Sequence, residues 1–219
     1  MKPSLYAHPF SSYSQKVQIA LYENDTPFIY RTLSGDDAAA LTEFAALAPA
    51  GKFPILVDDG NVIAESSVII EHLMIHHPGP VRLIPSDTRL ALEVRMMDRF
   101  FDNYVMTPTQ NVVSDFLRAA DQRDPVGVAQ AKSMLTRSYQ WLDGLMGKRP
   151  WGAGEQFSLA DCAAAPALFY ADWVHPIDES LSHLRAYRRR LLQRPSFARA
   201  VDEARRYRPL FPPGAPARD

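Results

Sequence analysis

Short apolar runs of strand length alternate with segments of helical spacing along the first 76 residues. The pattern predicts a strand over 5–7 and then a helix over 16–23, in which Val17, Ala20 and Leu21 share one face. A second strand is predicted over 28–32, a weaker helix over 36–47, two strands over 55–57 and 61–64, and a final helix. Two strands joined by a helix of this length indicate a parallel βαβ unit with a right-handed crossover. The predicted order is therefore βαβαββα.

The stretch from Gly51 to Ser67 joins the last two strands to that final helix. The Asp58-Asp59-Gly60 sequence supplies the glycine that a tight hairpin favours, and Pro54 stands at the start of a strand, where its missing donor is tolerated. Ser66 or Ser67 is a natural N-cap for the helix. A helix N-terminus with a hydroxyl is a ready anion site, although a plain hairpin followed by a capped helix explains the same residues.

From residue 88 onward the pattern is helical, and we find no convincing strand. A long helix is predicted over 88–120, bent near Thr107-Pro108 because proline removes a backbone donor. Further helices are predicted over 125–145, 181–193 and 195–206. An alanine-rich helix ending near Tyr170 opens with Ser158-Leu159-Ala160-Asp161, which has the form of a capping box. We predict an α/β plus all-α protein, with one domain over 1–78, a linker over 79–87 and a helical-bundle domain over 88–219.

The amino-acid composition excludes several functional classes and agrees with the predicted two-domain organisation. The 219 residues are 47% hydrophobic and 22% charged, which is ordinary for a globular protein, and a net charge of −1 gives no reason to expect nucleic acid or an anionic membrane as a partner. The single cysteine, Cys162, excludes an intramolecular disulfide and a CxxC redox pair. No apolar run approaches the ~18 residues of a membrane span, and the N-terminus turns polar too soon for a signal peptide. We expect a cytoplasmic protein.

Two adjacent histidines, His76 and His77, follow the final helix of the first half and suggest a metal site. We expect no metal there, because no carboxylate or further histidine is expected nearby at helical ligand spacing.

Three motifs, in this order and at this spacing, make the chain resemble the soluble glutathione transferases over essentially its whole length. They are FSSYSQKVQIAL from Phe10, GKFPILVDDGNVIAESSVIIEHL from Gly51 and FSLADCAAAPAL from Phe157. The resemblance implies a thioredoxin-like N-terminal domain, glutathione as co-substrate and a homodimer with twofold symmetry. It also implies that the third motif is a buried capping box, which serves folding and lies outside the active site.

The resemblance assigns a glutathione-binding role to residues of the second motif. In that family the proline that matches Pro54 is cis, and the preceding residue, here Phe53, pairs through its backbone with the cysteinyl unit of glutathione. Ser66 grips the γ-glutamyl carboxylate at a helix N-terminus, and Glu65 attracts the ammonium group. Lys52 is placed to reach the glycyl carboxylate.

The chemistry implied is formation of a thiolate. A free thiol has a pKa of ~8.5, and a hydroxyl that donates to sulfur at a helix N-terminus favours the anion. Counting back from Lys16, Ser11 falls where the tau and zeta classes carry their catalytic serine, and Ser12 where the delta and theta classes carry theirs. We favour Ser11 and keep Ser12 as the second candidate, with helix capping as the other explanation for both. Further hydroxyls that could act by chemistry alone are Ser14, Tyr6 and Tyr13.

The resemblance implies conjugation of this thiolate to a small hydrophobic electrophile bound between the domains. Residues expected to line the acceptor site, although helical spacing explains them equally well as core, are Phe10, Tyr104, Met106, Phe169 and Trp173. The alternatives are a glutathione-dependent isomerase or dehalogenase on the same scaffold, or a non-catalytic binding and interaction module.

Two departures from the zeta class weaken a maleylacetoacetate isomerase assignment. Tyr13 stands where that class typically has a cysteine, and Trp173 falls where it has a substrate-binding arginine. The absence of cysteine from the N-terminal corner also makes omega-type thiol exchange unexpected.

Overall fold

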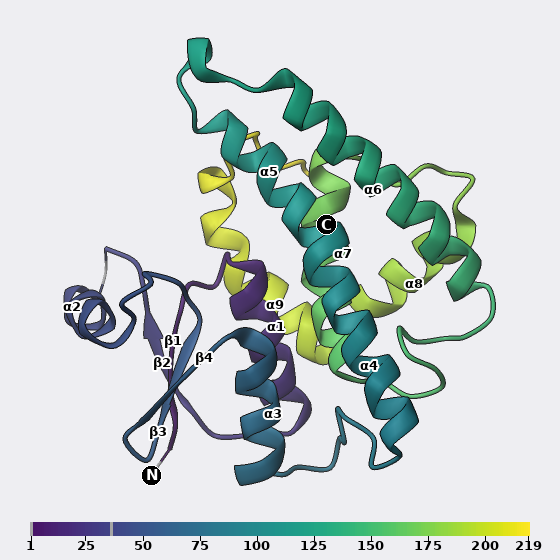
Figure 1. Ribbon diagram of the computed structural model, residues 1–219. Helices are drawn as coiled ribbons and strands as arrows, with labels where there is room; N and C mark the ends of the chain where they lie inside the picture. The colour runs from purple at the N-terminus through teal and green to yellow at the C-terminus, as the bar shows by residue number, and fades with distance from the viewer. Residues whose placement is uncertain (1, 36) are drawn as a thin grey trace.

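The computed structural model describes residues 2–35 and 37–219, and it combines a four-stranded sheet and its helices with an all-helical part (Figure 1). The strands are β1 (Ser4–Ala7), β2 (Ile29–Thr32), β3 (Ile55–Asp58) and β4 (Asn61–Ala64). Their order across the sheet is β2-β1-β3-β4. Strand β1 is parallel to β2, whereas β3 is antiparallel to both β1 and β4. The predicted α/β plus all-α class, the βαβαββα order and the parallel βαβ unit are confirmed.

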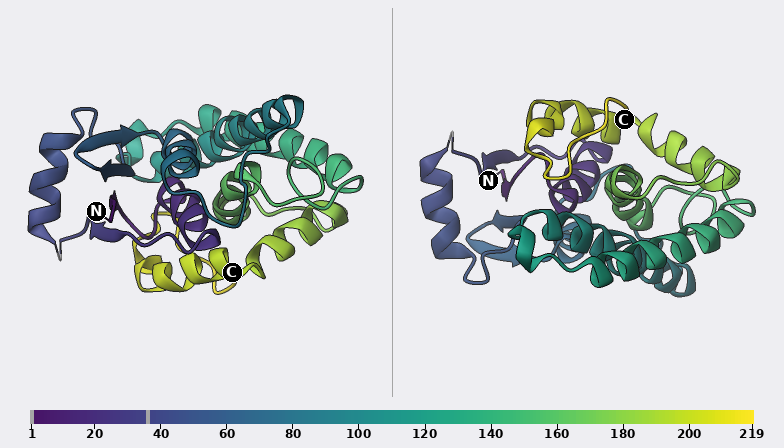
Figure 2. Two further views of the ribbon diagram at one scale, coloured as in Figure 1. Left: turned by 90° about the horizontal axis from the view of Figure 1, so that it is seen from below. Right: turned by 90° about the horizontal axis from the view of Figure 1, so that it is seen from above.

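The helices of the first part are α1 (Ser12–Glu23), α2 (Ala38–Leu47) and α3 (Ser66–His76). The side chains of β1 point alternately to the two faces of the sheet, and the helices pack against both faces. Leu5 and Ala7 belong to the main core with residues of α1 and α3, while Tyr6 joins a small cluster with Ala40 of α2. Figure 2 shows α2 on the outer side of the sheet and α1 and α3 between the sheet and the helical part. Asp36, where a helix was predicted to begin, lies outside the described residues.

The helical part is built around α7 (Leu159–Val174), whose residues from 159 to 172 are all buried. Ser158 and Asp161 form the predicted capping box at its start. The Asp161 carboxylate also accepts from the backbone N–H of Gly152 (2.7 Å) and the hydroxyl of Tyr187 (2.6 Å). The other helical segments are α4 (Thr88–Phe100), η1 (Phe101–Met106), α5 (Thr107–Phe116), η2 (Ala120–Gln122), α6 (Pro125–Met146), α8 (Ser182–Leu192), α9 (Pro195–Ala204) and η3 (Arg205–Leu210).

The helix predicted over 88–120 runs from α4 through η1 to α5 and ends at Phe116. The middle segment, η1, is a π-helix that ends two residues before Pro108. Pro108 has no N–H to donate to the carbonyl of Tyr104. The hydroxyl of Ser138 on α6 donates to that carbonyl instead, at 2.9 Å. Single π-helical turns inside α-helices are frequent at functional sites. Among the described residues, none of these helices combines the length and apolar character needed to cross a bilayer.

Candidate functional site

A pocket of about 680 Å³, here called the main pocket, is lined by residues from both parts of the chain. The loop before β3 and the start of α3 supply one side of it, and the segment from α4 to α5 supplies the other. Seven of the residues identified in the sequence line this pocket: Ser11, Tyr13, Lys52, Phe53, Pro54, Glu65 and Ser66. The fold therefore brings together two of the three sequence motifs.

Two turns shape one wall of the main pocket. The peptide bond between Phe53 and Pro54 is cis, as the resemblance implies. Glu65 has φ 69° and ψ 117°, and Ser66 is the buried first residue of α3. The first N–H groups of a helix lack partners within it, so the start of α3 presents donors and partial positive charge to the pocket. This wall is suited to a carboxylate.

The loop that carries Ser11 is fixed by His8. The backbone N–H of Ser11 donates to the His8 carbonyl at 3.0 Å, and the N–H of Phe10 donates to His8 Nδ1 at 3.1 Å. Burial, together with the charge of Arg206, lowers the pKa of His8. A lowered pKa favours the neutral ring, whose Nδ1 can accept this hydrogen bond.

Ser11 is the N-cap of α1, which begins at Ser12, four residues before the predicted start. The Ser11 Oγ accepts from the N–H of Ser14 at 3.3 Å. Because a hydroxyl has one donor and two acceptor positions, its hydrogen remains able to donate to a ligand. Capping and thiolate stabilisation are therefore compatible roles for this one side chain.

The other candidate hydroxyls are placed differently. Ser12 does not line the main pocket, and Ser14 is fully buried in α1. The Tyr6 hydroxyl donates to Glu43 of α2 at 2.6 Å. Tyr13 lines the main pocket, and burial raises its pKa to about 12, so its hydroxyl stays protonated near neutral pH and is able to donate. Of the proposed thiolate donors, Ser11 and Tyr13 are the two that reach the main pocket.

A second, smaller pocket of about 240 Å³, here called the side pocket, shares Ser11 and Gln110 with the main pocket. Two of the five residues expected at the acceptor site, Phe10 and Met106, line it, as does Ser12. Its other residues were not predicted: Thr109, Val113, Tyr170, Leu210, Phe211 and Pro212. The side pocket is thus largely apolar, and residues 210–212, at the end of η3 and just after it, form part of its lining.

Three of the residues expected at the acceptor site line neither pocket. Tyr104 is 47% exposed and packs against Phe100, and Phe169 is buried in the core. Trp173 packs against the Phe211 ring, 5.1 Å between centroids, and so supports the side pocket from behind. Helical spacing placed these aromatic residues on the correct helices, but it does not distinguish a core position from a pocket wall.

The opposite wall of the main pocket was missed by the sequence analysis. It consists of Arg99, Asp102, Asn103 and Gln110, from α4, η1 and α5. The signal in the sequence is polar residues at 99, 103 and 110, separated by four and seven, which is one stripe along a helix. The pocket therefore carries charges of both signs on both of its walls.

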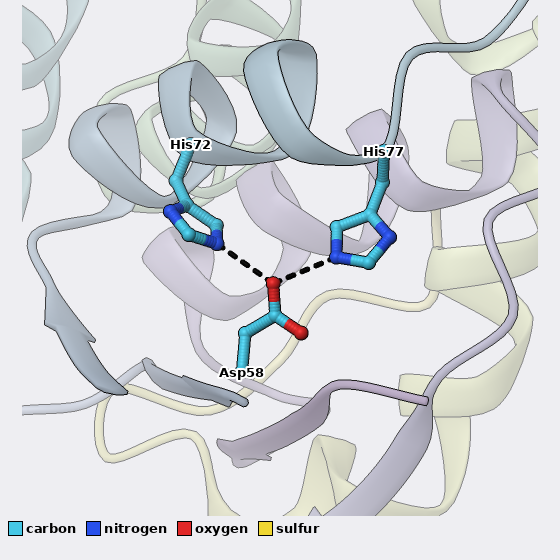
Figure 3. A group of neighbouring side chains, drawn as sticks. All are labelled: Asp58, His72 and His77. Atoms are coloured by element: carbon cyan, nitrogen blue, oxygen red, sulfur yellow. Dashed lines mark hydrogen bonds and ion pairs between the residues drawn. The ribbon is translucent and has the colours of Figure 1, made fainter. Parts of the chain in front are cut away.

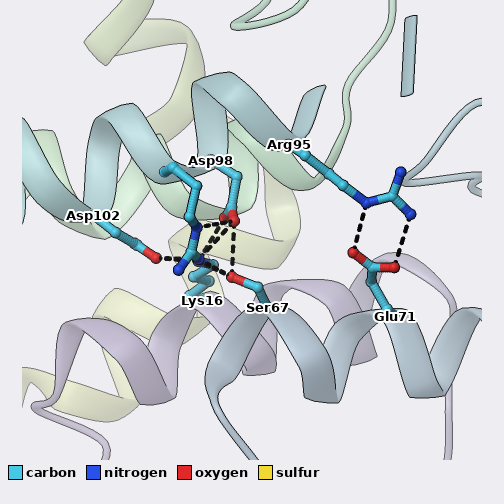
Figure 4. A network of polar contacts seen from close by, with 7 residues as sticks. Lys16, Ser67, Glu71, Arg95, Asp98 and Asp102 are labelled. Atoms are coloured by element: carbon cyan, nitrogen blue, oxygen red, sulfur yellow. Dashed lines mark hydrogen bonds and ion pairs between the residues drawn. The ribbon is translucent and has the colours of Figure 1, made fainter. Parts of the chain in front are cut away.

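Two residues of that wall, Arg99 and Asp102, belong to an ion cluster that extends into the core (Figure 4). The ammonium group of Lys16 on α1, 1% exposed, lies 2.5 Å from Asp98 and 2.8 Å from Asp102. It also donates to the hydroxyl of Ser67 on α3 at 2.9 Å, and Arg99 contacts both aspartates at 2.7 Å. Burial raises the pKa of Asp102. The cluster therefore joins α1, α3 and α4 beside the pocket, with each charge paired.

A separate group of possible metal ligands lies at the other end of α3. The expectation about His76 and His77 overlooked His72, one turn before His76. In the fold, His72 and His77 both approach Asp58 at the end of β3.

Comparison with known proteins matches two segments of the chain to family models. Residues 5–81 match the family model "Glutathione S-transferase, N-terminal domain", and residues 125–190 match "Glutathione S-transferase, C-terminal domain". The predicted boundaries at 78 and 88 stay a prediction.

Similar proteins of known name and structure cover most of the chain. A probable maleylacetoacetate isomerase of Caenorhabditis elegans is 27% identical, over 85% of this chain and 91% of its own. FtsZ-localized protein A of Caulobacter vibrioides is 28% identical, over 89% and 88%. A glutathione S-transferase from Methylobacillus flagellatus, solved with glutathione bound, has a TM-score of 0.81 at 25% identity and covers 91% of this chain and 98% of its own. This chain belongs to the glutathione S-transferase family.

Proposed function

We propose that this protein is a glutathione transferase, in which glutathione bound in the main pocket attacks a small apolar electrophile held in the side pocket. The observation that carries the proposal is the position of Ser11, which lines both pockets at the N-terminus of α1. A sulfur atom bound in the main pocket near this hydroxyl would face the mouth of the side pocket.

The charges of the main pocket complement those of glutathione, a tripeptide with two carboxylates and one ammonium group. The γ-glutamyl carboxylate is assigned to Ser66 at the start of α3, and the ammonium group to Glu65. Lys52 is assigned to the glycyl carboxylate. The backbone of Phe53, in the loop before β3, is assigned to the cysteinyl unit of glutathione.

In the reaction, the Ser11 hydroxyl stabilises the glutathione thiolate. A free thiol is mostly protonated at neutral pH, and both a donated hydrogen bond and the positive end of α1 favour its anion. With an aryl halide as acceptor, the sulfur forms a bond to carbon, and the halide leaves with the electron pair of the carbon–halogen bond. The thiol proton is released to solvent.

Replacement of Ser11 tests this assignment. We expect Ser11→Ala to lower kcat/KM for glutathione and an aryl halide roughly 10- to 1000-fold, because one donor to the developing anion is lost. We expect Ser12→Ala, one residue away, to lower it much less, because Ser12 lines the side pocket but not the main pocket in which the sulfur is placed.

Thermal unfolding of both variants provides the fold control, because loss of the N-cap costs about 1 kcal/mol by itself. An unchanged rate for Ser11→Ala together with a large loss for Ser12→Ala would move the role to Ser12.

A glutathione-dependent isomerase is the second candidate, favoured by the 27% identity to the C. elegans protein of that probable activity. The two reactions differ in thiol balance, because conjugation consumes one thiol for each acceptor and isomerisation returns it. Titration of free thiol during turnover of maleylacetoacetate and of aryl halides therefore separates them. Retention on immobilised glutathione without turnover of any acceptor would instead support a binding module.

A further inference from the structure

Asp58, His72 and His77 converge at the end of α3 that lies away from the main pocket (Figure 3). Asp58 is the last residue of β3, and His72 lies in the penultimate turn of α3. Asp58 Oδ2 lies 2.8 Å from Nε2 of His72 and 2.7 Å from Nε2 of His77. Two imidazole rings from one segment thus point at one carboxylate oxygen from another.

The convergence depends on where α3 ends. Residues five apart on a continuous helix point about 140° away from one another. His77 is the C-cap of α3 and has φ −131° and ψ 55°, so its backbone has left the helical conformation. Its ring can therefore face the same carboxylate as that of His72. The hairpin between β3 and β4 is thereby joined to the end of α3.

Two imidazole nitrogens and one carboxylate oxygen form a donor set that suits Zn²⁺ and its first-row neighbours. The three donor atoms lie within 4.8 Å of one another. Metal–ligand bonds of about 2.0–2.1 Å place tetrahedral donors about 3.3 Å apart, so the two close contacts need to widen by about 0.5 Å each. Both histidine side chains are partly exposed, at 17% and 26%, and have room to make that adjustment.

The second oxygen of the Asp58 carboxylate also suggests a bound metal ion. Its Oδ2 contacts both imidazoles, but its Oδ1 is buried and has no hydrogen-bond partner among the described residues. Buried polar atoms without a partner are uncommon in folded proteins, and a bound ion is one of the established ways of satisfying them. An ion between the two rings can also contact Oδ1, because carboxylates bind metals through either or both oxygens.

The location also favours a cation over an anion. The C-terminal end of a helix carries partial negative charge, and here it is joined by the Asp58 carboxylate. In the tautomer protonated at Nδ1, each imidazole presents its Nε2 lone pair towards the position that the ion would occupy.

We propose that Asp58, His72 and His77 bind one divalent transition-metal ion of the zinc class, with water completing its coordination. The ion would clamp the β3–β4 hairpin to the end of α3. Ser66 lies at the opposite end of this eleven-residue helix, roughly 16 Å away. The site is therefore structural and separate from the glutathione chemistry.

The test uses the full chain without an affinity tag, freed of metal with a chelator and dialysed. Calorimetric titration with Zn²⁺ is expected to give one site per chain, and Co²⁺ is expected to give a visible spectrum of nitrogen and oxygen ligation. His72→Gln, His77→Gln and Asp58→Asn should each weaken Zn²⁺ binding more than tenfold. The matched control is His183→Gln, which removes an exposed histidine 3.5 Å from Asp143 in another part of the molecule and should leave binding unchanged.

The thermal midpoint supplies an independent readout. Zn²⁺ should raise it in the wild-type protein and in His183→Gln, but not in His77→Gln. Retention on immobilised glutathione shows that each variant is folded, and should be the same with and without the metal. If a variant does not fold, the titration of the wild-type protein still tests the proposal. Absence of saturable binding of one Co²⁺ per wild-type chain would overturn it. Equal affinity in all variants, or a thiolate band from Cys162, would overturn it as well.

Discussion

The backbone of Glu65 is the most unusual feature of the main pocket. Its φ of 69° and ψ of 117° lie in a region that residues with a side chain rarely adopt, at a cost on the order of 1–3 kcal/mol. The Glu65 side chain makes no capping hydrogen bond, so the conformation brings α3 no compensation of that kind. The strained residue lies beside Ser66, at the point assigned to the γ-glutamyl end of glutathione.

Glu65→Ala and Glu65→Gly separate strain from binding. Both remove the carboxylate, and we expect both to weaken glutathione binding roughly 10- to 100-fold, the effect of losing a hydrogen bond to a charged group. Glycine adopts a positive φ without a steric cost, so Glu65→Gly should have the higher thermal midpoint of the two. Calorimetry and thermal unfolding measure the two effects, and equal midpoints would show that the backbone is not strained there.

At the scale of elements, the joint between α3 and α4 contains a titratable pair (Figure 4). Arg95 donates two hydrogen bonds of 2.8 Å to the carboxylate of Glu71. These bonds lower the pKa of Glu71 below its ordinary value of 4.5, against the opposing effects of burial and of Asp98. A carboxyl group whose pKa is lower in the folded state stabilises the fold above pH 4.5, and that stabilisation is lost as the pH falls through the folded-state value.

Glu71→Gln should therefore reduce the loss of unfolding free energy between neutral and acid pH. Below the folded-state pKa the wild-type protein and the variant should be about equally stable, and above pH 4.5 the wild-type protein should be the more stable. The pair is more than one-third exposed, so we expect a difference of less than about 1 kcal/mol. Urea unfolding between pH 3 and 7 measures it. Parallel curves for the two proteins would contradict this origin of the pH dependence.

The elements that could be predicted from the sequence are those determined by local patterns. The four strands, the hairpin glycine at 60 and the capping box at Ser158 depend on residues close together in the chain. The start of α1 at Ser12 was missed because the polar residues from 11 to 14 are buried or cap the helix. The hydrogen bond from the Ser138 hydroxyl to the Tyr104 carbonyl joins residues 34 apart in the chain, so no local pattern contains it.

The residues of the candidate site also fall into those that local sequence patterns predict and those that they do not. Its N-terminal wall could be predicted because the motif residues from 51 to 66 are close in sequence. The wall that contains Asp102 and Gln110 arises when the two parts of the chain pack together, so only a polar stripe on a helix indicated it. The side pocket depends on Phe211, which comes from the far end of the chain.

At the scale of the whole molecule, α3 and α4 expose apolar side chains along their outer faces. Val68 and Ile75 on α3 are 53% and 72% exposed, and Leu92 and Met96 on α4 are 69% and 47% exposed. We predict that these four residues form one apolar patch, because a contiguous patch of this kind marks a protein–protein contact. We therefore keep the prediction of a homodimer, with this surface as its interface.

Leu92→Glu tests the interface against Leu117→Glu, which changes an equally exposed leucine just beyond α5. Light scattering coupled to size-exclusion chromatography should give twice the chain mass of 24.6 kDa for the wild-type protein and for Leu117→Glu. Leu92→Glu should shift towards a single chain, because a charge would be buried at the interface. A wild-type protein that elutes as a single chain would contradict the prediction.

The two pockets have only Ser11 and Gln110 in common, and the residues from 210 to 212 belong to the side pocket alone. Mutations that reshape the end of the chain can therefore accumulate without disturbing the residues around the cis-proline turn. Under the proposed assignment of the two pockets, the preference for one acceptor compound over another can therefore change through residues 210–212 while glutathione binding stays the same.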